Sequence, residues 1–194
     1  MSRQAAHPVN EQFTRRWSPR SFTGEALPQS ELDALLEAAR WSPSASNLQP
    51  WRFVYGHAGS PAFAAILGGL VPFNQGWAQR ASVLLVVCSR TTSVAPGSTE
   101  AKANPWHAFD AGAAWMSLAL EAHLRGWITH GMGGFDAAAV RAAIGAPEDV
   151  AIHAVVAIGR QGPKEALPEG LQARELPNDR LPLSAIAAEG RFSG

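Results

Sequence analysis

Val83-Leu84-Leu85-Val86-Val87-Cys88 is an unbroken run of apolar residues, and it contributes most to the choice of fold class. A half-exposed strand alternates apolar and polar residues, whereas a continuous aliphatic run is typical of a strand covered on both faces. We therefore predict that this run lies near the centre of a sheet. Cys88 is the only cysteine in the chain, so no intramolecular disulfide forms, and its apolar neighbours favour a buried thiol over a nucleophile.

Outward from this run, the sequence predicts two further strands and several helices. Trp51 to Tyr55 and Val150 to Gly159 favour strands, and Trp127 to Thr129 favours a short extended piece before the glycine-rich segment 130–134. Thr91 to Pro105 is polar and rich in small residues, so we expect a mobile surface loop. Apolar spacing and start and stop signals predict helices over Glu11 to Arg16, Pro28 to Trp41, Ser60 to Gly69, Phe109 to Arg125 and Phe135 to Ile144.

The helix predicted over Phe109 to Arg125 is the longest and is apolar on all sides. A helix of this kind is buried, often by a second subunit. In the next helix we expect Asp136 to be the N-cap and Gly145 to stop the helix. From Gln161 onward the chain is rich in proline and charge, so we expect it to run across a surface or a partner. No domain boundary is apparent, and we predict one domain over residues 1–194.

Composition and charge argue against a disordered chain and against binding to nucleic acid or an anionic membrane. Hydrophobic residues make up 46% of the 194 residues and charged residues 16%, which argues against disorder. Sixteen Lys and Arg balance sixteen Asp and Glu, so no overall field would attract nucleic acid or an anionic membrane. The sequence has neither a signal-peptide core nor a stretch of about 18 apolar residues, and we predict a cytoplasmic protein.

Several common catalytic motifs do not occur in the sequence. G-x-G-x-x-G after a strand, G-x-x-x-x-G-K-[ST], H-E-x-x-H and G-x-S-x-G are all absent. The six histidines show neither i, i+4 pairing nor cysteine neighbours, which disfavours a structural zinc site. Dinucleotide-binding Rossmann enzymes, P-loop enzymes, zinc proteases and serine hydrolases therefore lose support.

Arg16-Trp17-Ser18-Pro19-Arg20 is the first segment that suggests a binding site. Pro19 disfavours helix at Ser18, so the backbone should be extended or turned. Alternate side chains of an extended segment share a face, so Arg16, Ser18 and Arg20 can converge on one anion such as a phosphate. The alternative interpretation is a solvated basic patch before a helix.

Pro43-Ser44-Ala45-Ser46-Asn47-Leu48-Gln49-Pro50-Trp51 is the second such segment. Its small hydroxyls and amides offer hydrogen-bond donors and acceptors with little side-chain entropy to lose on binding. Such a loop suits a planar heterocycle edged with amides. Alternatively, it is a connecting turn whose side chains satisfy one another.

Together these motifs resemble the N-terminal signature of the FMN-dependent nitroreductase family. Later motifs follow in the family's order and approximate spacing, and the resemblance covers the chain from about Arg15 to Ile186. The motifs are Arg16-x-Ser18-x-Arg20-x-Phe22, Leu35-Leu36-Glu37-Ala38-Ala39-Arg40, Pro43-Ser44-Ala45-Ser46-Asn47-x-Gln49-Pro50-Trp51-x-Phe53, Phe73-Asn74, the strand Ala81 to Cys88, Asp110-x-Gly112, Gly133-Gly134-Phe135-Asp136 and Arg180-Leu181-Pro182-Leu183.

The resemblance implies an α+β, nitroreductase-like fold, with a mixed, mostly antiparallel central sheet flanked by helices. It also implies an intertwined homodimer with one FMN at each end of the interface, which would cover the apolar helix. By resemblance, Arg16, Ser18 and Arg180 would hold the FMN phosphate, and Arg20 would lie near the ribityl chain and the pyrimidine edge. Arg174, in Arg174-Glu175-Leu176-Pro177, is the alternative to Arg180.

The remaining site residues also come from the resemblance. Asn74 would hydrogen-bond the pyrimidine side of the flavin ring, and the backbone around Gly133 and Gly134 would face the ring nitrogen that accepts hydride. Asp110 is expected to cap or tether its helix rather than touch the flavin. The loop residues that would reach in from the other subunit are Ser44, Ala45, Ser46 and Asn47.

The resemblance implies an oxidoreductase in which NAD(P)H reduces FMN and a nitroaromatic, quinone or related acceptor then takes the electrons, in a ping-pong cycle. The cofactor carries the chemistry, so no catalytic side chain is predicted, in keeping with the lack of an obvious triad or carboxylate pair. Some family members have an acidic residue where Gly133 stands and a lysine near Trp77, so the substrate side differs here. The alternatives are a flavin-fragmenting or dehalogenating enzyme of the same superfamily and a non-catalytic FMN-binding carrier or sensor.

Overall fold

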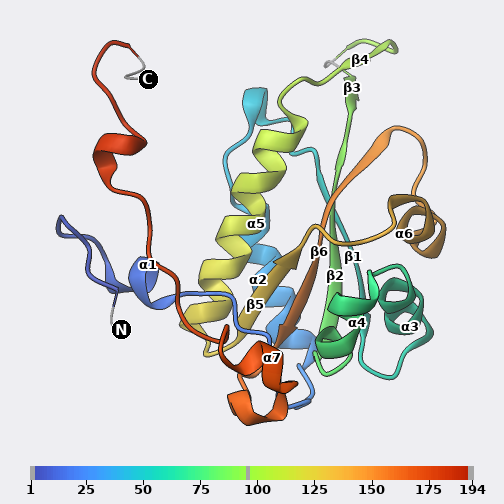
Figure 1. Cartoon of the computed structure of the whole chain (residues 1–194). Helices are drawn as coiled ribbons and strands as arrows, with labels where there is room; N and C mark the ends of the chain where they lie inside the picture. The colour runs from blue at the N-terminus through green and yellow to red at the C-terminus, as the bar shows by residue number, and fades with distance from the viewer. Residues whose placement is uncertain (1–2, 95–96, 192–194) are drawn as a thin grey trace.

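The computed structural model describes residues 3–94 and 97–191, which form a central sheet with helices on both faces (Figure 1). The sheet has four strands in the order β1-β2-β6-β5, and each neighbouring pair is antiparallel. An α+β fold with an antiparallel sheet flanked by helices is thereby confirmed. The strands are β1 (Trp51–His57), β2 (Val83–Arg90), β5 (Ile128–Met132) and β6 (Val150–Gly159).

Strand β2 is the central buried strand that the apolar run predicts. Every residue from Val83 to Ser89 is buried, and β2 pairs with β1 on one side and β6 on the other. Cys88 is buried as predicted, and burial raises the pKa of its thiol to about 11. The thiol is therefore protonated at neutral pH and cannot act as a nucleophile.

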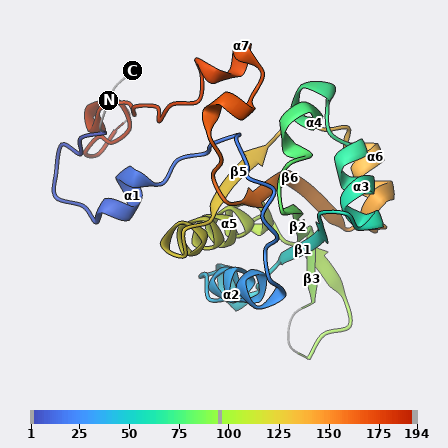
Figure 2. The same ribbon diagram turned by 90° about the horizontal axis from the view of Figure 1, so that it is seen from below.

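Alternate side chains of β2 enter two separate hydrophobic cores. Val83 and Leu85 pack against helices α2 and α5, whereas Leu84 and Val86 face the side covered by α3, α4 and α6. Figure 2 shows the same two layers from below, with α2 and α5 together on one face of the sheet. The helices are α2 (Gln29–Arg40), α3 (Pro61–Gly68), α4 (Pro72–Ala78), α5 (His107–Leu124) and α6 (Ala137–Ile144).

Helix ends follow the capping residues read from the sequence. The carboxylate of Asp136 accepts hydrogen bonds from the backbone N–H groups of Ala138 and Ala139. Gly145 ends α6 in the left-handed conformation, with a φ of 62°. Helix α4 was not predicted, because its seven residues include Asn74 and Gly76 and show no clear apolar period.

Two expectations about irregular segments are wrong. The segment expected as a loop at Thr91 to Pro105 contains a small hairpin of β3 (Thr92–Val94) and β4 (Ala101–Ala103), although residues 95–96 lie outside the described part. These strands escape the sequence pattern because they are three residues long and polar. Strand β5 also continues through Gly131 to Met132, because pairing with β6 supplies the backbone hydrogen bonds.

The N-terminal and C-terminal segments both extend away from the sheet on the same side of the molecule (Figures 1 and 2). The N-terminal segment holds α1 (Glu11–Arg15), and segments 3–14 and 179–186 share a cavity of about 500 Å³. No helix in residues 3–94 and 97–191 is long and apolar enough to cross a membrane. The C-terminal segment holds the short helices η2 (Lys164–Ala166), α7 (Glu169–Gln172) and η3 (Leu183–Ala185).

Helix α5 is only partly covered within one chain. Ala114 and Leu118 are buried against the sheet, but Phe109 is 76% exposed and Leu124 is 64% exposed. Large apolar side chains of the terminal segments are also open to solvent, among them Leu181 at 69%. The helix therefore has the apolar surface that the sequence predicts, but the chain by itself leaves much of it uncovered.

Candidate functional site

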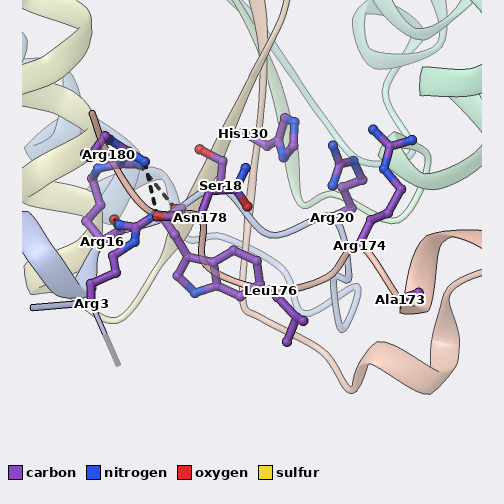
Figure 3. Close-up of a pocket in the computed structure, with 11 residues that line it drawn as sticks. Arg3, Arg16, Ser18, Arg20, His130, Ala173, Arg174, Leu176, Asn178 and Arg180 are labelled. Carbon is purple, nitrogen blue, oxygen red and sulfur yellow. Dashed lines mark hydrogen bonds between the residues drawn. The ribbon is translucent and has the colours of Figure 1, made fainter. Parts of the chain in front are cut away.

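A cavity of about 490 Å³ lies between the N-terminal basic segment and the chain after α7 (Figure 3). The structure brings the predicted residues Arg16, Ser18 and Arg20 to the lining of one cavity, but Trp17 lines it too and Arg16 and Arg20 lie at opposite ends rather than converging on one point. It also brings both Arg174 and Arg180 to the same cavity, and none of the described lining residues is acidic. The lining consists of Arg3, Arg16, Trp17, Ser18, Arg20, His130, Ala173, Arg174, Leu176, Asn178 and Arg180.

Three arginines gather at one end of this arginine pocket. Figure 3 shows Arg3, Arg16 and Arg180 together. Arg3 is held there because its Nη1 donates to the backbone oxygen of Arg16 at 2.7 Å. Burial lowers the pKa of Arg16, and the charges of Arg3 and Arg180 lower it further. Since an anion would relieve this repulsion, this end of the pocket is suited to a phosphate or carboxylate.

The other end of the pocket holds Arg20, Arg174 and His130. His130 Nδ1 lies 3.0 Å from the carbonyl oxygen of Pro19, and because a carbonyl only accepts, Nδ1 carries the proton. Burial lowers the pKa of His130 and the nearby Arg20 lowers it further, so the ring is neutral at pH 7. The indole of Trp77 packs on the ring, with centroids 4.7 Å apart.

Pairing between distant segments places the basic residues around the pocket. Phe22 forms a β-bridge with Gln161, just after β6, and the Ser21 hydroxyl donates to the carbonyl oxygen of Pro163 at 2.6 Å. The Glu175 carboxylate accepts hydrogen bonds from the backbone N–H groups of Arg20 and Ser21, at 2.6 and 2.9 Å. The tail thus crosses the surface of its own chain and forms one wall of the pocket.

Sequence reasoning did not predict several residues of this region, among them His130, Arg3 and Glu175. Arg3 precedes the first predicted helix and belongs to no motif, so the sequence held no signal for it. Glu175 had a weak signal, because it is the acidic residue within Arg174-Glu175-Leu176-Pro177. The sequence could not place Glu175 beside Arg20, because that contact depends on how the chain runs after β6.

Asn74, Gly133 and Gly134 lie together, outside the lining of the arginine pocket. Asn74 Nδ2 donates to the backbone oxygen of Gly134 at 3.0 Å. A Cβ on Gly134 would lie 2.7 Å from Asn74 Nδ2 and would displace that amide, whereas a Cβ on Gly133 would meet open space. The described residues contain no cluster of three or more His, Cys, Asp or Glu side chains that could hold a metal ion.

Ser44, Ala45, Ser46 and Asn47 do not line the arginine pocket of their own chain. The last three form η1 (Ala45–Asn47). Asp110 of α5 is buried, and both of its carboxylate oxygens accept from the backbone N–H of Ala45, at 3.2 and 3.3 Å. Asp110 therefore tethers this loop to the helix.

The loop backbone is strained, and its own polar atoms hold it. Ser46, Asn47 and Gln49 have positive φ angles of 49°, 54° and 47°. Such angles are uncommon outside glycine and persist where the surroundings impose them. The Ser44 hydroxyl accepts from the backbone N–H of Gln49 at 3.0 Å, which closes the turn.

Comparison with known proteins gives consistent results. The chain matches the nitroreductase family over residues 13–60 and 56–160. A crystal structure of an oxidoreductase containing FMN is 46% identical and superimposes with a TM-score of 0.95, covering 99% of this chain and 96% of that one. A protein named NADH dehydrogenase from Thermus thermophilus is 32% identical over 87% of this chain and 92% of its own length. A 15.4 kDa protein of Mycolicibacterium smegmatis is 36% identical over 73% of this chain and 97% of its own.

Proposed function

The chain belongs to the nitroreductase family, and from this premise we propose that it is an FMN-dependent oxidoreductase that uses NAD(P)H. We propose nitroaromatics, quinones or related compounds as its electron acceptors. NAD(P)H and the acceptor would take turns at the same open face, in a ping-pong cycle. The 46% identical oxidoreductase contains FMN, which supports the cofactor, and the Thermus relative is named for NADH, which supports the electron donor.

The arginine pocket is the observation on which the proposal rests. FMN carries a phosphate dianion, and the end of the pocket at Arg3, Arg16 and Arg180 offers cations that repel one another and face no carboxylate in the lining. We propose that Arg16, Ser18 and Arg180 hold the phosphate. At the other end, Arg20 Nε is buried and has no hydrogen-bond partner, so it is free to serve a ligand. The residues present therefore fit the cofactor.

The remaining roles follow from where the residues lie. Arg20 would face the pyrimidine edge, where a guanidinium stabilises negative charge. Asn74 would donate to the same side of the ring, and the backbone at Gly133 and Gly134 would lie near the hydride-accepting nitrogen. When bound, FMN supplies the hydride and electron chemistry, and the protein binds, orients and tunes it. His130 is neutral at pH 7 and donates Nδ1–H to Pro19, so it serves as a wall of the pocket.

We further propose an intertwined homodimer built from chains that each form one domain. The exposed apolar residues of α5 and the terminal segments supply surface for such an interface. The loop of Ser44, Ala45, Ser46 and Asn47 would then reach the flavin of the partner, and its residues do not line the arginine pocket of their own chain. We place this dimer in the cytoplasm.

Flavin content and rapid mixing test the proposal. The purified protein should be yellow or should take up added FMN, and a colourless protein that binds none would contradict it. Anaerobic mixing with NADH or NADPH should bleach the bound flavin within the turnover time. Bound flavin that no nicotinamide reduces would indicate a carrier or sensor, and breakdown of the flavin itself would indicate a fragmenting enzyme.

A further inference from the structure

Glu175 is a buried carboxylate that lies behind the lining of the arginine pocket, between two residues that line it, Arg174 and Leu176. Glu175 is 5% exposed and directly follows Arg174. Oε1 accepts hydrogen bonds from two consecutive backbone N–H groups, those of Arg20 at 2.6 Å and Ser21 at 2.9 Å. This contact fixes the backbone at the point where Arg20 projects toward the cavity.

The second carboxylate oxygen of Glu175, Oε2, makes no hydrogen bond and interacts with Arg20 through its charge alone. Oε2 is buried without a hydrogen-bond partner and lies 3.9 Å from Nη1 of Arg20. The two charges therefore attract each other, but no hydrogen bond joins them, and the buried Nε of Arg20 also remains unbonded. Arg20 thus keeps donors for a ligand while part of its charge is compensated.

The two ends of the arginine pocket differ in whether a buried carboxylate lies beside the arginines. At the end with Arg3, Arg16 and Arg180, the pKa of Arg16 is lowered by burial and by the two neighbouring cations. At the other end, the side chain of Glu175 is 2% exposed and faces Arg20, whose side chain is 19% exposed. A charge buried this deeply is poorly screened by solvent, so its field extends into the pocket.

We propose that Glu175 is a positioning residue that aims Arg20 at the flavin and moderates the positive charge at the pyrimidine edge. This inference rests on the proposed function, in which that edge lies against Arg20. Reduced flavin gathers negative charge there, so a nearby buried carboxylate disfavours the reduced form and lowers the midpoint potential of bound FMN. At the phosphate end the carboxylate that acts on Arg3 is that of Asp179, which is exposed and therefore screened by solvent, so most of the positive charge there remains for anchoring.

Replacing Glu175 with Gln separates the two roles, because the amide oxygen still accepts from the backbone while the charge is removed. The midpoint potential of bound FMN should become more positive in Glu175→Gln, and reduced FMN should bind on the order of tenfold more tightly relative to oxidised FMN. Glu169→Gln is the matched control, since Glu169 is exposed on α7 and should leave the potential unchanged. A purely structural Glu175 would alter the thermal unfolding midpoint but not the potential.

The outcomes distinguish this inference from the proposed function. If the wild-type protein binds no FMN, the proposed function fails. If it binds FMN and Glu175→Gln leaves the potential unchanged, the inference about Glu175 is wrong. Should Glu175→Gln fail to fold, the double variant Arg20→Gln with Glu175→Gln leaves neither charge buried alone. Its potential should lie above that of Arg20→Gln alone, and equal potentials would overturn the inference.

Discussion

The arginine pocket and the Ser44–Asn47 loop are the two polar regions that the sequence singles out, and they are built in opposite ways. One chain assembles the pocket by joining Arg20 to Glu175, residues 155 positions apart. The loop is local, and Asp110 holds it on α5, outside that pocket. The comparison shows that one chain by itself brings the basic residues together, whereas the loop lies outside that pocket, which is where the proposed homodimer needs it if it is to serve a second chain.

The largest effect should come from Arg16. Arg16→Ala removes a charge-assisted contact from the phosphate, which costs about 1.5–3 kcal/mol and weakens FMN binding roughly 10- to 150-fold. Fluorescence titration of the apoprotein with FMN measures this change. Arg15→Ala is the matched control, because Arg15 is exposed and paired with Glu11 at 2.9 Å. If both variants bind FMN as the wild type does, the pocket is not the phosphate site.

A smaller effect should distinguish Arg180 from Arg174. Arg180 lies with Arg16 and lowers its pKa, whereas Arg174 lies beside Arg20 at the far end of the pocket (Figure 3). Arg180→Ala should therefore weaken FMN binding by about tenfold, and Arg174→Ala by less, because Arg174 stands at the end of the pocket away from the proposed phosphate position. The same titration compares the two variants. A larger loss in Arg174→Ala would move the phosphate to the other end.

Mixing two defective variants tests whether the loop serves a second chain. Arg16→Ala damages the pocket, and the double variant Ser44→Ala with Asn47→Ala damages the loop. In a two-fold dimer, chains mixed in equal amounts and refolded together should regain about a quarter of the intact sites, since each mixed dimer has one undamaged site. FMN bound per chain at a limiting flavin concentration measures the recovery. Loss of binding without any recovery would place both regions in one chain's site.

Sequence could predict the elements whose signals are local. The apolar run of β2, the cap at Asp136 and the stop at Gly145 all lie where the residue pattern put them. That Arg16, Ser18 and Arg20 line one cavity likewise follows from their closeness in the chain, although their places at its two ends do not.

What sequence missed depends on contacts between distant segments. Arg3 enters the pocket through a hydrogen bond to the backbone of Arg16, and Glu175 through bonds to Arg20 and Ser21. The hairpin of β3 and β4 is stabilised by its neighbours, as Thr91 donates to the carbonyl oxygen of Asp149 at 2.8 Å. Strands this short carry too few residues for a pattern to form.

The smallest effect should appear as acid sensitivity of the folded chain, to which His130 in the pocket contributes beside His123 and His153. Burial lowers the pKa of His123 and His130, and arginines of segment 15–20 lower it further in both, while Glu175 and backbone carbonyls oppose the shift at His130. A histidine with a lowered pKa binds its proton more weakly when folded, so below about pH 6.5 the unfolded chain takes up protons first and the free energy of unfolding falls. The thermal midpoint of the apoprotein should thus drop between pH 7.5 and 5.5, and His130→Gln should reduce that drop. The control variant His7→Gln, at an exposed position in the N-terminal segment, should show the same drop as the wild type. An equal drop in the wild type, His130→Gln and His7→Gln would show that His130 carries none of the effect.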